Sequence, residues 1–111
     1  MIVWQKSMTL VSEIYKITRK LPKEEIYGIS NQMRRAAVSI PSNIAEGYER
    51  NSAKEFVQFL YIEKSSRAEL ETQIFICINE NFFSKEEASY ALNLCLEIKR
   101  MLSSLIDKYK D

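Results

Sequence analysis

The stretch Asn31–Arg50, NQMRRAAVSIPSNIAEGYER, decides the fold. Its apolar residues recur at intervals of three and four, which places them on one side of an α-helix. With one residue from just before the stretch, this apolar arc consists of Ile29, Met33, Ala36, Ala37, Ile40 and Ile44. Pro41 lies inside the pattern, but the arc continues in phase on both sides of it. The sequence therefore predicts one helix, kinked at Pro41, with Ser30 as its N-cap and Gly47–Asn51 as its end.

Polar residues form a second row beside the apolar arc: Gln32, Arg35, Ser39, Asn43, Glu46 and Arg50. A solvent-exposed helix face usually mixes Lys and Glu, whereas this row places short hydrogen-bonding groups between two arginines. We therefore predict a polar seam between helices, or an interface, in which Arg35 and Glu46 are at least partly buried.

The same seam is expected to include charged residues of the next helix. Glu63 and Arg67 lie four residues apart within an apolar face, where unpaired charges would be costly. They are expected to pair with each other, to reach the polar row, or to lie at an edge open to water. Glu63 or Glu69 is a candidate acidic partner for an arginine of the seam. The complete predicted seam is Gln32, Arg35, Ser39, Asn43, Glu46, Glu63, Arg67 and Glu69.

The rest of the chain predicts three further helices. A wide apolar face runs from about Val3 to Lys20 and ends before Pro22, because the residue before proline avoids the helical region. The segments Ser52–Glu55 and Ser84–Glu87 each follow the capping-box pattern S-x-x-E and begin the third and fourth helices. Four helices with short connections predict an all-α, antiparallel up-down-up-down four-helix bundle, formed by residues 1–111 as a single domain.

Two of these helices carry more apolar residues than a small bundle buries. The first helix has a face wider than a narrow seam requires. The third helix has a second apolar stripe that points away from its main face: Val57, Tyr61, Ala68 and Phe75. We therefore predict a closed homo-oligomer, in which two different patches of the same protomer meet.

Charge and composition limit the possible functions. The chain has 16 basic and 15 acidic residues, so it lacks the excess charge of a strongly basic nucleic-acid-binding protein. The end of the first helix is nevertheless basic, with Lys16, Arg19, Lys20 and Lys23. These cations complement the helix dipole, and they are also a candidate patch for the phosphates of RNA.

No catalytic or cofactor site is apparent in the sequence. The chain has no His and no glycine-rich phosphate loop, and Ser39 and Ser42 have no obvious base beside them. We therefore predict a non-enzymatic protein without metal or cofactor. Cys77 and Cys95 lie on apolar helix faces and are expected to be buried free thiols. Because no apolar run is long enough to span a bilayer and no secretory signal is evident, a cytoplasmic protein is expected.

The central helix carries a family resemblance. The string Gln32–Gly47, QMRRAAVSIPSNIAEG, resembles the signature of the small bacterial proteins encoded in 23S ribosomal RNA intervening sequences, also called S23 proteins. Trp4–Lys6, the group formed by Pro22, Glu25 and Tyr27, and the run AELETQ at 68–73 are also similar. The likeness extends over almost the whole chain. It departs from the family in the third helix, where many members have Ala and Gly in place of Glu63 and Ser65.

The resemblance implies an antiparallel four-helix bundle that assembles as a pentameric ring, with no established enzymatic activity. A related family, the accessory variability protein of diversity-generating retroelements, partners a reverse transcriptase and binds nucleic acid through a strongly basic surface. Two hypotheses follow for this chain. The first is an oligomeric interaction module that binds RNA or an RNA-handling protein. The second is a structural or scaffolding homo-oligomer with no nucleic-acid role.

Overall fold

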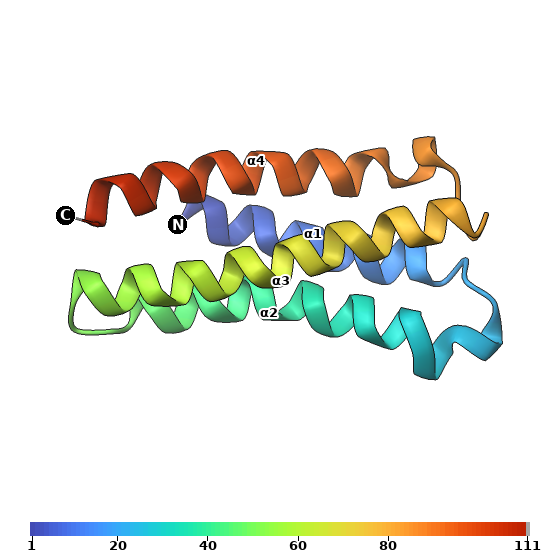
Figure 1. Cartoon of the computed structure of the whole chain (residues 1–111), viewed down its shortest axis with the longest axis horizontal. Coiled ribbons are helices and arrows are strands. Elements are labelled where there is room, and N and C mark those ends of the chain that lie inside the picture. Colours follow the sequence, from blue (N-terminus) through green and yellow to red (C-terminus); the bar gives the residue numbers. More distant parts are fainter. Residues whose placement is uncertain (111) are drawn as a thin grey trace.

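The computed structural model describes residues 1–110 as a bundle of four long helices (Figure 1). These are α1 (Ile2–Thr18), α2 (Asn31–Tyr48), α3 (Ala53–Asn79) and α4 (Lys85–Tyr109). Figure 1 shows successive helices running in opposite directions, with the two chain ends at the same end of the bundle. The predicted all-α bundle is confirmed, and no strand occurs in residues 1–110.

The connection from α1 to α2 consists of two short helical turns with a kink at Gly28. It contains a 3₁₀ turn, Lys23–Glu25, followed by a π-helical turn, Ile26–Ser30. Gly28 adopts non-helical backbone angles inside the second turn, φ −107° and ψ −120°. This folded connection brings the start of α2 back beside the end of α1, and it shapes the surface at that end of the bundle.

The core follows the apolar spacing. Each long helix packs against its neighbours in chain order, and α4 closes the bundle against α1. Met33, Ala37, Ile40 and Ile44 have no solvent exposure, so the arc predicted from α2 is confirmed as the side that faces the core. Burial of apolar surface, at about 25 cal/mol per Å², is the main force that holds these faces together.

The helix α2 continues through Pro41, as predicted, and the kink at Pro41 stays a prediction. Two side chains just after Pro41 donate to backbone carbonyls one turn earlier: the Ser42 hydroxyl to Val38 at 2.8 Å, and the Asn43 amide to Ser39 at 2.8 Å. Polar groups therefore add hydrogen bonds where proline has removed a backbone donor.

Helix α2 begins directly after Ser30 and ends at Tyr48, inside the predicted range Gly47–Asn51. The predicted capping bond of Ser30 does not form, whereas those of Ser52 and Ser84 do. Ser30 already has helical angles, φ −58° and ψ −50°, and its side chain makes no capping bond, because the chain enters α2 from the π turn. Gly47 is buried within α2, which ends one residue later. Ser52 accepts a hydrogen bond from the Glu55 amide, and Ser84 forms a complete capping box with Glu87.

Candidate interaction sites

The four basic residues predicted as a phosphate patch are all exposed at the α1 end of the α1–α2 connection: Lys16, Arg19, Lys20 and Lys23. They are not equivalent. The Lys20 ammonium pairs with the Glu87 carboxylate of α4, and this contact is the main cause that holds the pKa of Glu87 below its ordinary value. Within residues 1–110, Arg19 and Lys23 have no acidic partner at ion-pair distance.

Arg19 and Lys23 lie at a pocket of about 280 Å³. Its lining residues come from the end of α1, the connection and the start of α2: Thr18, Arg19, Leu21, Lys23, Ile26, Ser30 and Arg34. Arg34 is a basic residue that the sequence analysis did not assign to this site. It is distant from Arg19 and Lys23 along the chain, and only the folded connection brings the three together. In the sequence, the feature that could have indicated this assignment is the position of Arg34, a basic residue in the first turn of the second helix.

The position of Arg34 is fixed by two contacts. Its Nε donates a hydrogen bond to the Thr18 hydroxyl at 2.9 Å, and its guanidinium carbon lies 4.7 Å from the centre of the Tyr15 ring. The Thr18 hydroxyl in turn donates to the carbonyl of Ile14 at 2.6 Å. Arg34 is therefore held against α1 through one edge and one face of its guanidinium group.

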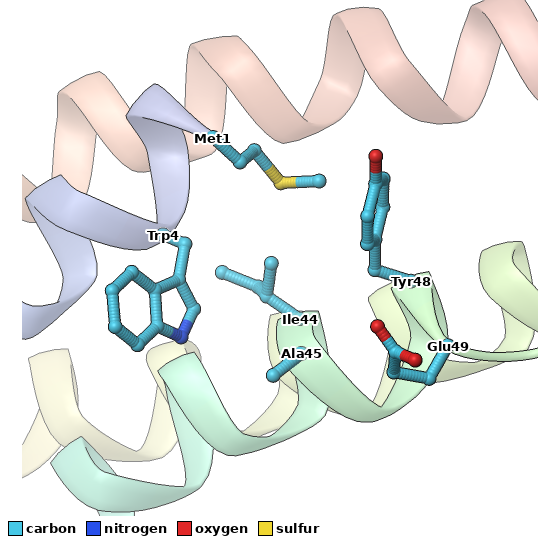
Figure 2. A pocket seen from close by; sticks show the side chains of 6 residues that line it. All are labelled: Met1, Trp4, Ile44, Ala45, Tyr48 and Glu49. Atoms are coloured by element: carbon cyan, nitrogen blue, oxygen red, sulfur yellow. The ribbon is translucent and has the colours of Figure 1, made fainter.

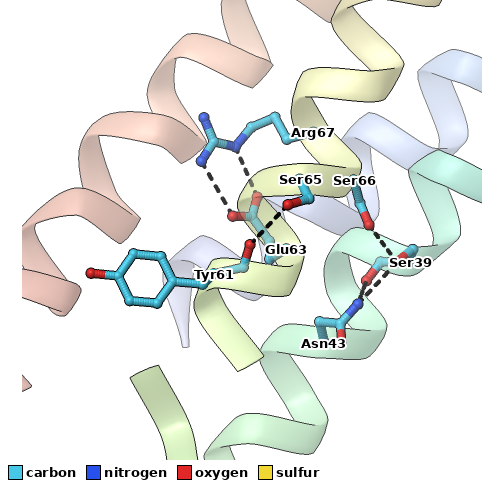
Figure 3. A network of polar contacts seen from close by, with 7 residues as sticks. All are labelled: Ser39, Asn43, Tyr61, Glu63, Ser65, Ser66 and Arg67. Carbon is cyan, nitrogen blue, oxygen red and sulfur yellow. Dashed lines mark hydrogen bonds and ion pairs between the residues drawn. The ribbon is translucent and has the colours of Figure 1, made fainter. Parts of the chain in front are cut away.

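The polar seam forms in part between α2 and α3. The Ser39 and Ser66 hydroxyls lie 2.7 Å apart across the two helices, and the Asn43 amide donates to the Ser39 hydroxyl at 2.9 Å (Figure 3). Ser39 and Asn43 are partly buried, as predicted. Ser66 was not assigned to the seam, although its helix position faces α2.

The prediction for the charged members of α2 is wrong. Arg35, Glu46 and the neutral Gln32 are exposed. Within residues 1–110, no ion pair joins Arg35 to a carboxylate of α3 or Glu46 to a cation of α3. Glu69 is also exposed and accepts a hydrogen bond from Gln73 at 3.3 Å. These side chains lie on the outer flank of the row, where a charged group keeps its hydration at no cost.

Glu63 and Arg67 form a buried ion pair within α3. Arg67 Nε and Nη2 donate to the two oxygens of Glu63 at 2.8 and 3.2 Å, and the two side chains are 0% and 6% exposed (Figure 3). Of the three alternatives that the sequence leaves open for these residues, the structure shows that they pair with each other. Burial raises the pKa of the Glu63 carboxyl, and the guanidinium of Arg67 opposes that rise. The pair satisfies its own charges inside the bundle, which suits a structural role.

The two cysteines are buried free thiols, as predicted. Burial raises the pKa of the Cys77 thiol to about 11 and that of the Cys95 thiol to about 12. Both thiols are therefore protonated at neutral pH and poor nucleophiles. Among residues 1–110, no three His, Cys, Asp or Glu side chains are grouped closely enough to hold a metal ion.

An apolar groove of about 380 Å³ lies on the surface between α1 and α2. It is lined by Trp4, Met8, Val11, Val38, Pro41, Ser42 and Ala45. A second pocket, of about 230 Å³, adjoins it at the chain termini, and Trp4 and Ala45 line both. Figure 2 shows Met1 and Trp4 of the α1 end facing Ile44 and Ala45 of α2, with Tyr48 and Glu49 beyond them. The wide apolar face of α1 is therefore only partly used by the core.

The second apolar stripe of α3 lies mostly on the surface. Tyr61 and Phe75 are 46% and 50% exposed, and Ala68 is exposed between them. Val57, in contrast, is only 8% exposed and belongs to the core, so its assignment to a free interface is wrong. It lies in the first turns of α3, on the side that lines a pocket with Tyr109 of α4. Ile62 and Ile76 of α3 are also exposed.

Residues 1–104 match the family described as 23S rRNA-intervening sequence protein. The chain belongs to this family. A crystal structure of an S23 ribosomal protein family member of unknown function, from Bacteroides thetaiotaomicron, is similar with a TM-score of 0.86 at 26% identity. The similarity covers 94% of this chain and 97% of that one. No curated protein matches the chain.

The family match confirms the resemblance carried by the α2 string, and the similar crystal structure supports the same bundle. Neither the family description nor the crystal structure points to catalysis. Within residues 1–110, no helix combines the length and apolar character needed to cross a membrane.

Proposed function

We propose that this S23-family protein is a small homo-oligomeric interaction module without enzymatic activity. The observation that supports the proposal is the apolar surface that the bundle leaves outside its core. The groove between α1 and α2, with Trp4 and Met8 at its rim, is exposed on one side of the protomer. The α3 stripe, with Tyr61 and Phe75, is exposed separately. Exposed apolar patches of this kind are typical of protein–protein contacts.

The two patches differ in composition and in the helices that carry them. A contact between two different patches of identical chains is heterologous, and it closes into a ring when the rotation between neighbours allows. We propose that the α3 stripe of one protomer packs into the α1–α2 groove of the next. The number five follows from the characterised relatives of the family, and we propose a pentamer on that ground.

The assembly is tested by light scattering coupled to size-exclusion chromatography at micromolar concentration. The protein should elute with a multiple of the protomer mass. Tyr61→Lys with Phe75→Glu should lower that mass and leave the helical circular dichroism largely unchanged. Asn93→Lys with Ser104→Glu, which introduces the same charges at exposed positions of α4, serves as the matched control. A monomeric mass at every concentration would contradict the proposed homo-oligomer. A dimeric mass would contradict the proposed ring.

A second function, the binding of RNA, is favoured by the basic end of α1. Lys16, Arg19 and Lys23 are exposed there, and a closed ring would repeat them around one axis. Contacts of this kind are electrostatic and show little sequence preference. The alternative is a scaffolding homo-oligomer with no nucleic-acid role.

Fluorescence anisotropy with short oligouridine and oligoadenosine strands separates these alternatives. If RNA binds, affinity should be similar for both strands and should fall steeply from about 50 to about 200 mM salt. Replacing Arg19, Lys20 and Lys23 by Ala should weaken binding and reduce its salt dependence. An absence of binding at low salt would favour the scaffold, and binding unchanged by the triple substitution would exclude this patch.

A further inference from the structure

The pocket between the end of α1 and the start of α2 has the composition of an anion site. It combines three cationic side chains, Arg19, Lys23 and Arg34, with the hydroxyls of Thr18 and Ser30. Leu21 and Ile26 complete its lining. We propose that this pocket binds a single phosphate group, with the guanidinium of Arg34 as the principal ligand.

Arg34 is positioned before any ligand arrives. Thr18 is buried and uses its own hydrogen to bond Ile14, so its oxygen is left to accept from Arg34 Nε at 2.9 Å. The Tyr15 ring supports one face of the guanidinium at 4.7 Å. Within residues 1–110, no acidic group lies at ion-pair distance from Arg34, so its remaining N–H groups are available. A planar guanidinium held in this way matches two oxygens of a phosphate and loses little entropy on binding.

Ser30 adds a hydroxyl to the lining of the pocket. The residue is 5% exposed and lines the pocket. Its side chain makes no capping hydrogen bond to α2. An oxygen of a bound anion would accept the hydrogen of this hydroxyl.

The charge of the pocket favours phosphate over carboxylate. Arg19 and Lys23 are both without acidic partners in residues 1–110, and the carboxylates of Glu24 and Glu25 do not line the pocket. Three cations and one hydroxyl offer more donors than the two oxygens of a carboxylate can use. A phosphate group supplies more acceptor oxygens and up to two negative charges, which matches this donor set.

Two sources of phosphate share this chemistry: a phosphodiester of the RNA backbone, and free phosphate. The first source rests on the RNA-binding function proposed above, and the second does not. Lys16 and Lys20 do not line the pocket, and Lys20 is already paired with Glu87. The proposed site therefore includes fewer basic residues than a general basic patch at this end of the bundle would. Binding at the site should also depend on Arg34, whereas binding to a general patch should not.

The test is isothermal titration calorimetry of the full chain with inorganic phosphate, and in a second arm with short oligouridine. Arg34→Gln should weaken phosphate binding by roughly tenfold to a hundredfold, as expected for the loss of charge-assisted hydrogen bonds. Arg35→Gln, the same change at the next position of α2, is exposed outside the pocket and should leave binding unchanged. Ser30→Ala should weaken binding by a smaller factor.

A thermal unfolding scan of each variant identifies loss of fold, and Arg19→Gln with Lys23→Gln removes two cations without touching the Thr18 contact. This double variant should also lose affinity. If phosphate binds in a way that depends on Arg34 and RNA does not bind, the proposed phosphate site is supported and the proposed RNA-binding function is contradicted. If phosphate does not bind, and RNA binds equally well to the Arg34→Gln and unaltered proteins, the proposed phosphate site is wrong. The proposed RNA-binding function would then be supported.

Discussion

Gly47 of α2 lies directly against Phe59 of α3, where a Cβ atom added to the glycine would stand 2.7 Å from the Phe59 Cβ. The same added atom would lie 3.1 Å from the Phe56 ring and 3.3 Å from the Phe56 carbonyl oxygen. No side chain fits at these distances without a shift of the α3 backbone. The glycine therefore sets how closely α2 and α3 approach next to the loop that joins them.

Gly47→Ala should lower stability because of this contact. In an open helix the change from Gly to Ala is favourable by roughly 1 kcal/mol. Here overpacking should outweigh that gain, with a net loss on the order of 1–3 kcal/mol in the free energy of unfolding. Urea denaturation followed by circular dichroism measures it. Arg35→Gly, at an exposed position of the same helix outside the groove, should cost about 1 kcal/mol by propensity alone. A stabilised Gly47→Ala variant would mean that the helices separate easily.

The buried pair of α3 gives a second prediction. Arg67→Ala leaves the Glu63 carboxylate buried without its partner, and the unfolding free energy should fall by several kcal/mol, on the order of 3. Glu63→Met with Arg67→Met removes both charges and fills similar volume, so it should cost much less than the sum of the single changes. Additive losses in chemical denaturation would show that the two side chains do not depend on each other.

The helices of this bundle could be predicted from the sequence because their signals are local. The apolar spacing of α2 and the S-x-x-E patterns at Ser52 and Ser84 depend on residues within a few positions of each other. The buried Glu63–Arg67 pair is similarly local, since its members are one helical turn apart. Each of these features is encoded in a contiguous segment and needs no knowledge of the neighbouring helices.

The surface sites depend on how helices are placed, and the sequence was less informative there. Arg34 reaches the basic pocket only because the connection between α1 and α2 folds into two helical turns. Val57 and Tyr61 are on one sequence stripe, yet only Val57 lies deep enough to join the core. Arg35 and Ser39 are one turn apart on the same row, but only Ser39 meets a partner, Ser66 of α3. Small rotations about a helix axis decide such differences.

The ion pair between Lys20 and Glu87 predicts a pH-dependent contribution to stability. The pKa of Glu87 is lowered in the folded state, mainly by the hydrogen bond from Lys20. A carboxyl with a lowered pKa stabilises the fold above its unfolded value, near 4.5, and this contribution is lost as pH falls through the folded pKa. Glu87→Gln should therefore lower the melting temperature at pH 7, and the difference from the unaltered protein should disappear in strong acid.

The neighbouring Glu86 provides the control for this effect. It is exposed in the same first turn of α4 and has no ion-pair partner within residues 1–110. Glu86→Gln should lower the melting temperature only by the helix-dipole effect. It should not show the additional decrease in melting temperature that Glu87→Gln shows at neutral pH. The additional loss should also shrink at high salt, because the Lys20 pair is exposed. An equal effect of the two substitutions would contradict a role for the pair.

The two thiols should report the opening of the core. Cys77 and Cys95 have no solvent exposure, and burial raises their pKa values to about 11 and about 12. At pH 8 the folded protein should therefore react with Ellman's reagent far more slowly than a free thiol, since access and the thiolate fraction are both low. Both thiols should react at once in denaturant. Arg67→Ala should accelerate labelling under native conditions, because the fraction of open molecules rises as stability falls. Fast labelling of the unaltered protein in its folded state would contradict the burial of either cysteine. Cys77→Ala and Cys95→Ala, measured separately, would identify which of the two thiols is accessible.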